Sequence, residues 1–195
     1  MKSLVILFLI VSLNFSLFAQ DTCFDSCWSR FDSSEVPFLQ KNKEILGQLV
    51  GCKAPDFVMN FLDNKSTSLR KLEGKIVLLS FWFAACPGCI SQLPALNRLS
   101  DEYNSNSNVV FVALGRDSED VVHAFLRKHQ FNYNHSLSSD ELKRAYCILN
   151  GWPMNLVIDK QGIVRYIRSG GPIEGMENDM IPYHDMKPVI DMYLK

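Results

Sequence analysis

The chain has 195 residues, enough for one domain of ordinary size whose core needs no disulfide or metal to hold it together. Apolar residues make up 47% and charged residues 21%, which excludes a largely disordered chain. Its 20 basic and 21 acidic side chains leave a net charge of −1, without the basic excess of nucleic-acid binders. We therefore expect a globular protein with no nucleic-acid partner, whose six cysteines must be explained by their positions.

The N-terminal residues have the pattern of a secretory signal. A positive start precedes an apolar run over residues 4–13, and cleavage is expected after Ala19. An uncleaved membrane anchor is the alternative, but the run is short and Asn14 interrupts it. We expect export to the periplasm or another extracytoplasmic site, with no transmembrane segment once the signal is removed. The predicted parts are a signal at 1–19, a leader at 20–50 and one domain at 51–195.

Hydrophobic periodicity predicts strands that alternate with helices. The apolar run at residues 76–83 indicates a central strand buried on both faces. Before it we expect a short helix at 38–50 and two short strands, the first at 57–62. After it we expect a helix with an apolar stripe from Ile90 to Tyr103, a strand at 108–114, a helix capped by Asp117 or Ser118, a short helix at 140–146, strands at 156–158 and 163–167 in a hairpin, and a helix at 186–194. This order predicts an α/β fold with a mixed central sheet flanked by helices.

Two cysteines lie where the central strand is predicted to end and the long helix to begin, in the segment Cys86-Pro87-Gly88-Cys89. Unpaired N–H groups and the helix dipole at a helix N-terminus favour thiolate over thiol. Because thiolate is the attacking species in disulfide exchange, Cys86 is the expected nucleophile and Cys89 the resolving thiol. Pro87 suits the first helical position, where a missing N–H does no harm.

Metal and haem sites are the competing uses of this cysteine spacing. A structural zinc site needs four ligands, and no second close pair or matching histidine pair follows. Haem attachment needs His directly after the second cysteine, where this chain has Ile90. We therefore expect no metal and no cofactor. The histidines are expected to be solvated, with His135 and His184 in loops.

A second candidate element is Pro153, which follows Gly151-Trp152 just before a predicted strand. The sequence allows a cis peptide bond there, and the backbone edge beside it could pair with an incoming peptide; a plain turn proline is the alternative. The candidate substrate-binding residues are Trp152, Pro153, Pro87 and Gly88. Trp82 is expected to pack beneath the site, and Gln92 is a candidate supporting residue.

The sequence leaves the pairing of the other four cysteines open. A structural disulfide is expected in the leader, either between Cys23 and Cys27 or with Cys52 as one partner. Cys147 lies six residues before Pro153. It is therefore either a third, accessory redox thiol at the active-site face or a small buried residue.

Several motifs in order resemble a thioredoxin-fold protein: FWFAACPGC at residues 81–89, Pro94 in the following helix, and Pro153 before the VID of residues 157–159. The patterns GxxAPxF at 51–57 and LxxLxGK at 69–75 narrow the resemblance. They are similar to those of extracytoplasmic TlpA/ResA-type thiol–disulfide oxidoreductases, which are related to the AhpC/TSA group. The resemblance covers residues 51–195.

This resemblance implies roles and partners. Cys86 would be the exposed nucleophile, Cys89 its buried partner and Pro153 a cis-proline that faces them. It also implies an N-terminal hairpin and a family insert at residues 116–150. The implied partners are protein disulfides or thiols and a membrane-bound thiol donor of electrons, and we expect a monomer.

The chain departs from the family around the cysteine pair. Ala85 stands where the family usually has Trp, Gln92 where many members have Glu, and Ser80 where thioredoxin has a buried Asp. Neither Gln92 nor Ser80 can transfer a proton as a carboxylate does, so rate and pH dependence stay open. Pro87-Gly88 also differs from the Gly-Pro of thioredoxin, and because the residues between the cysteines influence the redox potential, the direction of electron flow stays open as well.

Three alternatives to disulfide exchange remain at this point. A peroxiredoxin-like peroxidase needs Thr or Ser three residues before its cysteine, where this chain has Phe83. A metal-binding module or metallochaperone could use the same cysteine pair. A thioredoxin-fold scaffold with a static disulfide is the third.

Overall fold

The computed structural model describes residues 22–25, 27, 38–148, 151–170 and 180–195. The predicted signal at 1–19 lies outside the described residues. The strands are β1 (Val58–Asn60), β2 (Ser66–Ser68), β3 (Ile76–Trp82), β4 (Val109–Gly115), β5 (Asn134–Leu137), β6 (Met154–Ile158) and β7 (Val164–Ser169). The helices are α1 (Thr22–Asp25), α3 (Phe38–Gln48), α4 (Pro87–Ser91), α5 (Leu93–Glu102), α6 (Glu119–Leu126), α7 (Asp140–Ala145) and α8 (Ile181–Leu194), with a 3-10 turn η1 at Arg70–Leu72.

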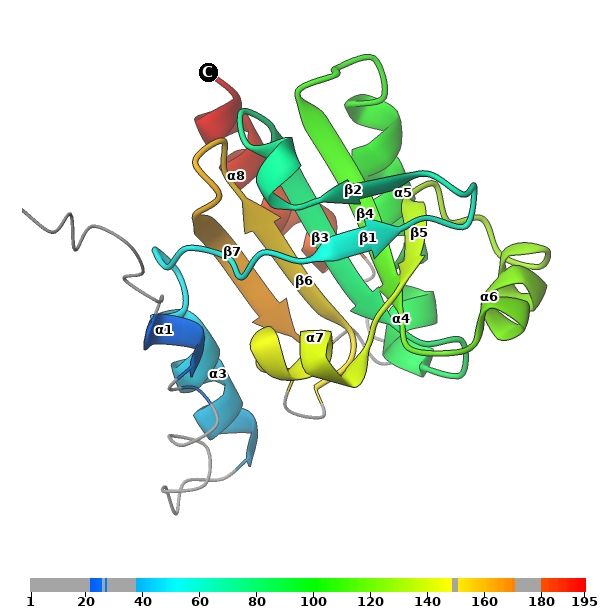
Figure 1. Ribbon diagram of the computed structural model, residues 1–195, viewed down its shortest axis with the longest axis horizontal. Coiled ribbons are helices and arrows are strands. Elements are labelled where there is room, and N and C mark those ends of the chain that lie inside the picture. The colour runs from blue at the N-terminus through cyan, green and yellow to red at the C-terminus, as the bar shows by residue number, and fades with distance from the viewer. Residues whose placement is uncertain (1–21, 26, 28–37, 149–150, 171–179) are drawn as a thin grey trace, which may run out of the picture.

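The central sheet has the strand order β5-β4-β3-β6-β7. Strand β4 pairs in parallel with β3 and β5, whereas β6 pairs antiparallel with β3 and β7 (Figure 1). All seven residues of β3 are buried, as its continuous apolar sequence predicts. The prediction of a mixed sheet flanked by helices is confirmed, and β1 and β2 form the expected antiparallel hairpin.

Side chains of β3 alternate between two hydrophobic clusters, one on each face of the sheet. The first cluster includes Val77, Leu79 and Phe81 with side chains from α1, α3, β1 and α7, and the second includes Ile76, Leu78 and Trp82 with side chains from α4, α5, α6 and α8. In Figure 1 the hairpin and α7 lie in front of the sheet, and α5 and α8 lie behind it. Both cysteines of the CxxC segment belong to the second cluster.

The long helix predicted after Cys86 is divided into α4 and α5 at Gln92. Pro94 lies at the start of α5 and explains the break. Proline has no N–H to donate, and its ring clashes with the carbonyl four residues earlier, here that of Ile90. The break leaves Gln92 between the end of α4 and the start of α5. The side chain of Gln92 is buried there.

The C-terminal half holds two further differences from the predicted elements. Strand β5 was not predicted, because four residues are too few to show a period of two. It carries His135, which is 9% exposed, so the prediction of a solvated loop histidine is wrong at this position. Helix α8 begins at Ile181, five residues before its predicted start, and therefore contains His184.

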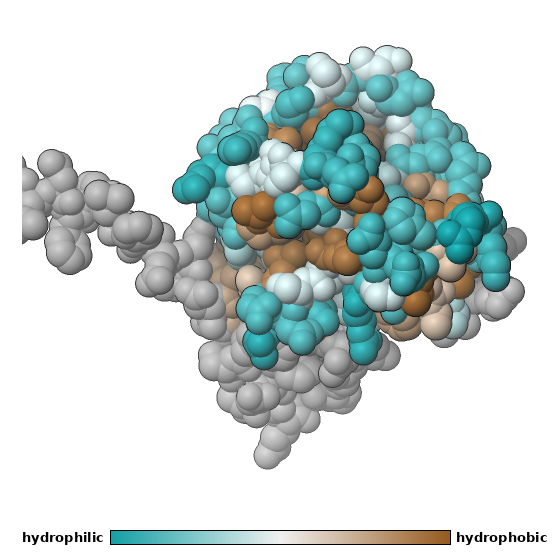
Figure 2. All heavy atoms as spheres, turned by 45° about the vertical axis from the view of Figure 1, so that its right-hand side comes forward, coloured by the Kyte–Doolittle hydropathy of each residue, from teal (hydrophilic) through white to brown (hydrophobic). Residues whose placement is uncertain are grey.

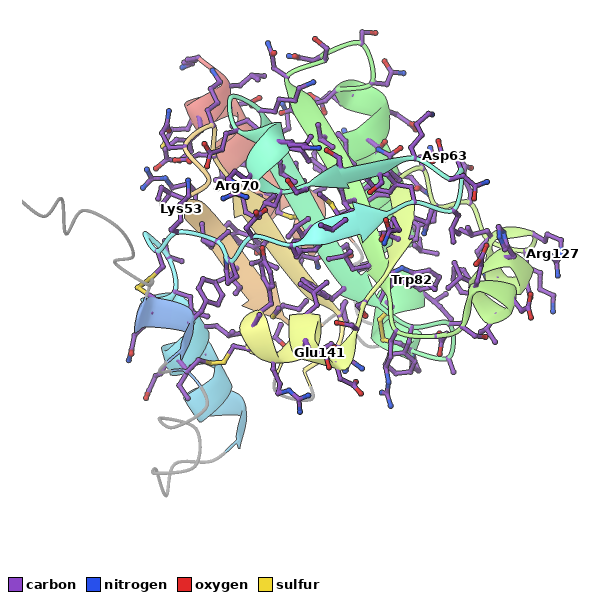
Figure 3. All side chains as sticks on the ribbon, in the orientation of Figure 1. Lys53, Asp63, Arg70, Trp82, Arg127 and Glu141 are labelled. Carbon is purple, nitrogen blue, oxygen red and sulfur yellow. A yellow bond between two sulfur atoms is a disulfide. The ribbon has the colours of Figure 1, made fainter. Side chains whose placement is uncertain are left out.

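All six cysteines are paired, as Cys23–Cys52, Cys27–Cys147 and Cys86–Cys89. The first two fasten the N-terminal segment to the domain, and Figure 3 shows them near α1 and α3, away from the pair at α4. Cys147 is fully buried in the first hydrophobic cluster, across the sheet from the CxxC pair. It is therefore not a free third thiol, and the accessory-redox interpretation is corrected in favour of the buried one.

Few large apolar side chains are exposed on the described part of the surface. Its large exposed apolar side chains are Val50, Val58, Val121, Leu137 and Met192. Figure 2 brings the side of α6 and β5 forward, where apolar and hydrophilic side chains alternate. None of the helices within the described ranges is long and apolar enough to cross a membrane.

Candidate functional site

The cysteine pair lies at the carboxyl end of β3, where the chain turns into α4. Ligand sites of open α/β sheets form at this edge, beyond the carboxyl ends of the parallel strands. Cys86 is the N-cap of α4, and its Sγ accepts a hydrogen bond from the N–H of Cys89 at 3.1 Å. The carbonyl oxygen of Cys86 accepts the N–H of Ile90 at 3.1 Å. The sulfur of Cys86 therefore faces the N–H groups of the first helical turn.

The pair is a disulfide with a Cα–Cα distance of 5.2 Å. Cys86 is 3% exposed and Cys89 2% exposed, whereas Ala85 and Pro87 on either side of Cys86 are exposed. The expectation that Cys86 is the exposed member is thus wrong for this oxidised state. Its sulfur is bonded to Cys89 and packs in the second cluster, so access for a partner lies over Ala85 and Pro87.

Pro153 lies beside this pair at the same end of the sheet. The peptide bond between Trp152 and Pro153 is cis, as the resemblance implies. Met154, the next residue, is the cross-strand partner of Phe81 near the end of β3, so the antiparallel register brings Pro153 next to the turn into α4. The ring of Trp152 packs edge-on against Phe83 with centroids 5.6 Å apart. The substrate-binding roles of Trp152, Pro153, Pro87 and Gly88 stay predictions.

Trp82 lies beneath the site with 1% of its surface exposed, as predicted (Figure 3). Its ring lies 4.7 Å from that of Phe125 and 5.8 Å from that of His135, centroid to centroid. Burial lowers the pKa of the His135 imidazole, which keeps this ring uncharged at neutral pH. The layer of side chains below the disulfide is therefore aromatic, and the His135 ring within it is uncharged at neutral pH.

A neutral polar pair lies in the same face of the core. The side-chain amide of Asn155 donates to Gln92 Oε1 at 2.8 Å, and both residues are at most 3% exposed. Ser80 is the cross-strand partner of Asn155, and its hydroxyl finds no hydrogen-bond partner among the described residues. Amide and hydroxyl groups thus occupy the two positions where the family resemblance leads one to look for a carboxylate.

Replacing Gln92 with Leu is expected to destabilise the fold by about 1–3 kcal/mol, because it leaves the buried amide of Asn155 without its acceptor. Urea unfolding measures the loss. Gln161→Leu is the matched control, because Gln161 is exposed and a surface change of this kind stays within about 0.5 kcal/mol. Equal stability of the two variants would contradict the role given to the buried pair.

Two residues after β4 contact the turn into α4, and sequence reasoning did not find them. Of the two expected caps, Ser118 is the N-cap of α6, whereas Asp117 accepts the backbone N–H of Ala84 with its Oδ2 at 2.6 Å. The guanidinium of Arg116 lies 5.6 Å from the ring centre of Phe83. No local sequence pattern predicts these contacts, because they depend on the parallel pairing of β3 with β4.

Potential metal ligands are scattered over the described part of the chain. No three His, Cys, Asp or Glu side chains there come together in a way that could hold an ion. The two sulfurs of the CxxC pair are bonded to each other. The Cys86–Cys89 pair is suited to thiol–disulfide exchange.

A disulfide that joins a helix N-cap to the first turn, at the carboxyl edge of this mixed sheet, is typical of thioredoxin-like thiol–disulfide oxidoreductases, and this chain is one of them. Residues 50–167 match the AhpC/TSA family, so the chain belongs to that family.

Similar proteins agree with this assignment. The thioredoxin-like protein YneN of Bacillus subtilis is 29% identical over 131 residues, which cover 66% of this chain and 76% of YneN. The thiol-disulfide oxidoreductase ResA of Halalkalibacterium halodurans is 27% identical over 132 residues, 67% of this chain and 74% of ResA. A thiol:disulfide interchange protein from Chlorobium tepidum has the same fold, with a TM-score of 0.59, 23% identity and coverage of 73% and 96% of the two chains.

Proposed function

We propose that this protein is an extracytoplasmic enzyme that reduces protein disulfides through the Cys86–Cys89 pair. The observation that carries the proposal is the position of Cys86 at the N-cap of α4, where its Sγ accepts the N–H of Cys89 at 3.1 Å. The same donor stabilises a negative charge on that sulfur once the disulfide is opened. Cys86 is thus the member of the pair suited to attack.

The proposed cycle transfers two electrons and two protons. The Cys86 thiolate attacks one sulfur of the substrate disulfide, the substrate S–S bond breaks, and the leaving thiolate takes up a proton. Cys89 then loses its proton and attacks the Cys86 sulfur of the mixed disulfide. The second substrate thiol leaves, and the enzyme is left with the Cys86–Cys89 disulfide that the structure contains. A thiol donor must reduce this disulfide before the next turnover.

Two features support a location outside the cytoplasm. The Cys23–Cys52 and Cys27–Cys147 disulfides are of a kind that persists in oxidising compartments and is rare in reducing ones. The apolar run at residues 4–13, with a small residue at position 19, has the sequence pattern of an export signal. We propose that the donor of electrons is a membrane-bound thiol protein, as the family resemblance implies.

Reduction of insulin by dithiothreitol, followed by the turbidity of the released chains, tests this function. The protein at micromolar concentration is expected to accelerate the reaction well above the rate with dithiothreitol alone. A rate equal to that background would refute the reductase. The same sample, reduced and given hydrogen peroxide, is expected to consume no more peroxide than a two-thiol reagent does, since Phe83 occupies the position of the peroxidase hydroxyl.

A further inference from the structure

Arg116 is a charged residue at the edge of the site that the proposed cycle leaves without a role. It follows the last residue of β4, and its backbone N–H donates to the carbonyl of Trp82 at 3.0 Å. Its guanidinium carbon lies 5.6 Å from the ring centre of Phe83 and 6.0 Å from that of Trp152, within the range of cation–π contact. The backbone of Arg116 is therefore held beside the end of β3, and its cation lies near the two rings.

Phe83 and Trp152 connect this cation to the reactive pair. The two rings pack edge to face at 85° with centroids 5.6 Å apart, and both side chains are partly exposed. The carbonyl of Phe83 accepts the N–H of Cys86 at 3.2 Å, and Trp152 directly precedes the cis-proline. A peptide that brings a sulfur to Cys86 must therefore pass close to both rings and to Arg116.

The positive charge of Arg116 is available to such a peptide. Among the residues that the structure describes, no carboxylate forms an ion pair with Arg116, whose side chain is exposed. Asp117 is engaged by the N–H of Ala84. Asp140 is paired with Lys143, which is the main reason that the pKa of Asp140 lies below its usual value, and Arg116 adds only a minor contribution.

We propose that Arg116, held against Phe83 and Trp152, selects substrates that carry an acidic residue beside the reactive cysteine. A guanidinium offers five N–H donors in a planar fork that matches a carboxylate, and contact with two rings restricts its motion before the substrate arrives. The rings supply apolar contact for the neighbouring part of the peptide. This inference rests on the proposed reductase function and adds the class of substrate.

The test uses three peptides with one intramolecular disulfide each, identical except for Glu, Gln or Lys next to the cysteine attacked first. Rates of reduction by the wild-type full chain and by Arg116→Gln are compared. The wild type is expected to prefer the Glu peptide over the Lys peptide by roughly five- to tenfold, as for a partly exposed bidentate ion pair. In Arg116→Gln this ratio is expected to fall to about one, with the Gln peptide changed less than about twofold.

Arg127→Gln is the matched control. Arg127 is an exposed arginine at the C-terminal end of α6, and Figure 3 shows it pointing away from the sheet. This variant is expected to keep the wild-type preference for the Glu peptide over the Lys peptide. Addition of 0.5 M salt is expected to reduce that preference, because salt screens the ion pair. An unchanged ratio in Arg116→Gln overturns the proposal. So does an equal slowing of all three peptides, which would mean that Arg116 acts on the Cys86 thiolate instead. If the wild type reduces no peptide at all, the reductase function itself has failed.

Discussion

Replacing Cys86 with Ser is expected to lower disulfide reduction by a factor on the order of 10³ or more, because an alcohol at this position cannot replace the attacking thiolate. Cys89 remains in this variant, but it lies inside the first turn of α4, whereas Cys86 holds the N-cap position, where the sulfur accepts a helix N–H. The insulin assay measures the loss. Circular dichroism and urea unfolding of the same sample show whether the fold is kept.

Cys89→Ser provides the complementary result. Here Cys86 still attacks, but no second thiol resolves the mixed disulfide, so the covalent adduct with substrate is expected to accumulate to about one equivalent. Intact-protein mass spectrometry under non-reducing conditions detects the adduct. The Cys86→Ser variant treated in the same way is the control and is expected to form none. If Cys86→Ser formed the adduct and Cys89→Ser did not, the roles of the two cysteines would be reversed.

Removing the Cys27–Cys147 disulfide is expected to have the largest effect on stability. It links residues separated by 120 positions, for which the loop-entropy relation gives about 5 kcal/mol. The Cys23–Cys52 disulfide spans 29 positions, for which the same relation gives about 4 kcal/mol. Urea unfolding measures the stability of two double variants, one with Cys27→Ala and Cys147→Ala and the other with Cys23→Ala and Cys52→Ala. The first is expected to have the lower free energy of unfolding.

Both variants keep the reactive pair, and this separates stability from function. Cys27 and Cys147 lie in the hydrophobic cluster on the opposite face of the sheet from Cys86 and Cys89. Turnover per folded molecule is therefore expected to equal that of the wild type. A folded variant without Cys27 and Cys147 that no longer turned over substrate would show that this disulfide takes part in the electron transfer.

The fold was predictable where the sequence pattern is local and strong. The run of eight residues from Ile76, apolar except for Ser80, identifies the central strand, and Cys86-Pro87 marks the start of a helix through the N1 preference of proline. Strand β5 could not be predicted, because it exists only through its pairing with β4. The buried state of His135 follows from the same pairing, which no local period reveals.

The site was predictable in its reacting atoms and much less in its surroundings. Chemistry at a helix N-terminus singles out Cys86 and Cys89 without any tertiary information. The partner of Cys27 is 120 residues away, and six cysteines allow 15 pairings if all are bonded, so no spacing rule could select Cys147. Arg116 reaches the site only because β4 lies beside β3.

Of the three disulfides, Cys86–Cys89 is expected to be redox-active and the other two structural. Equilibration of the oxidised protein in dithiothreitol buffers of stepped potential, followed by thiol alkylation and peptide mass spectrometry, measures the three potentials separately. Cys86–Cys89 is expected to open first, at a potential above about −300 mV, while Cys23–Cys52 and Cys27–Cys147 stay closed well below that value. A Cys86–Cys89 pair that stayed oxidised as long as the other two would contradict it.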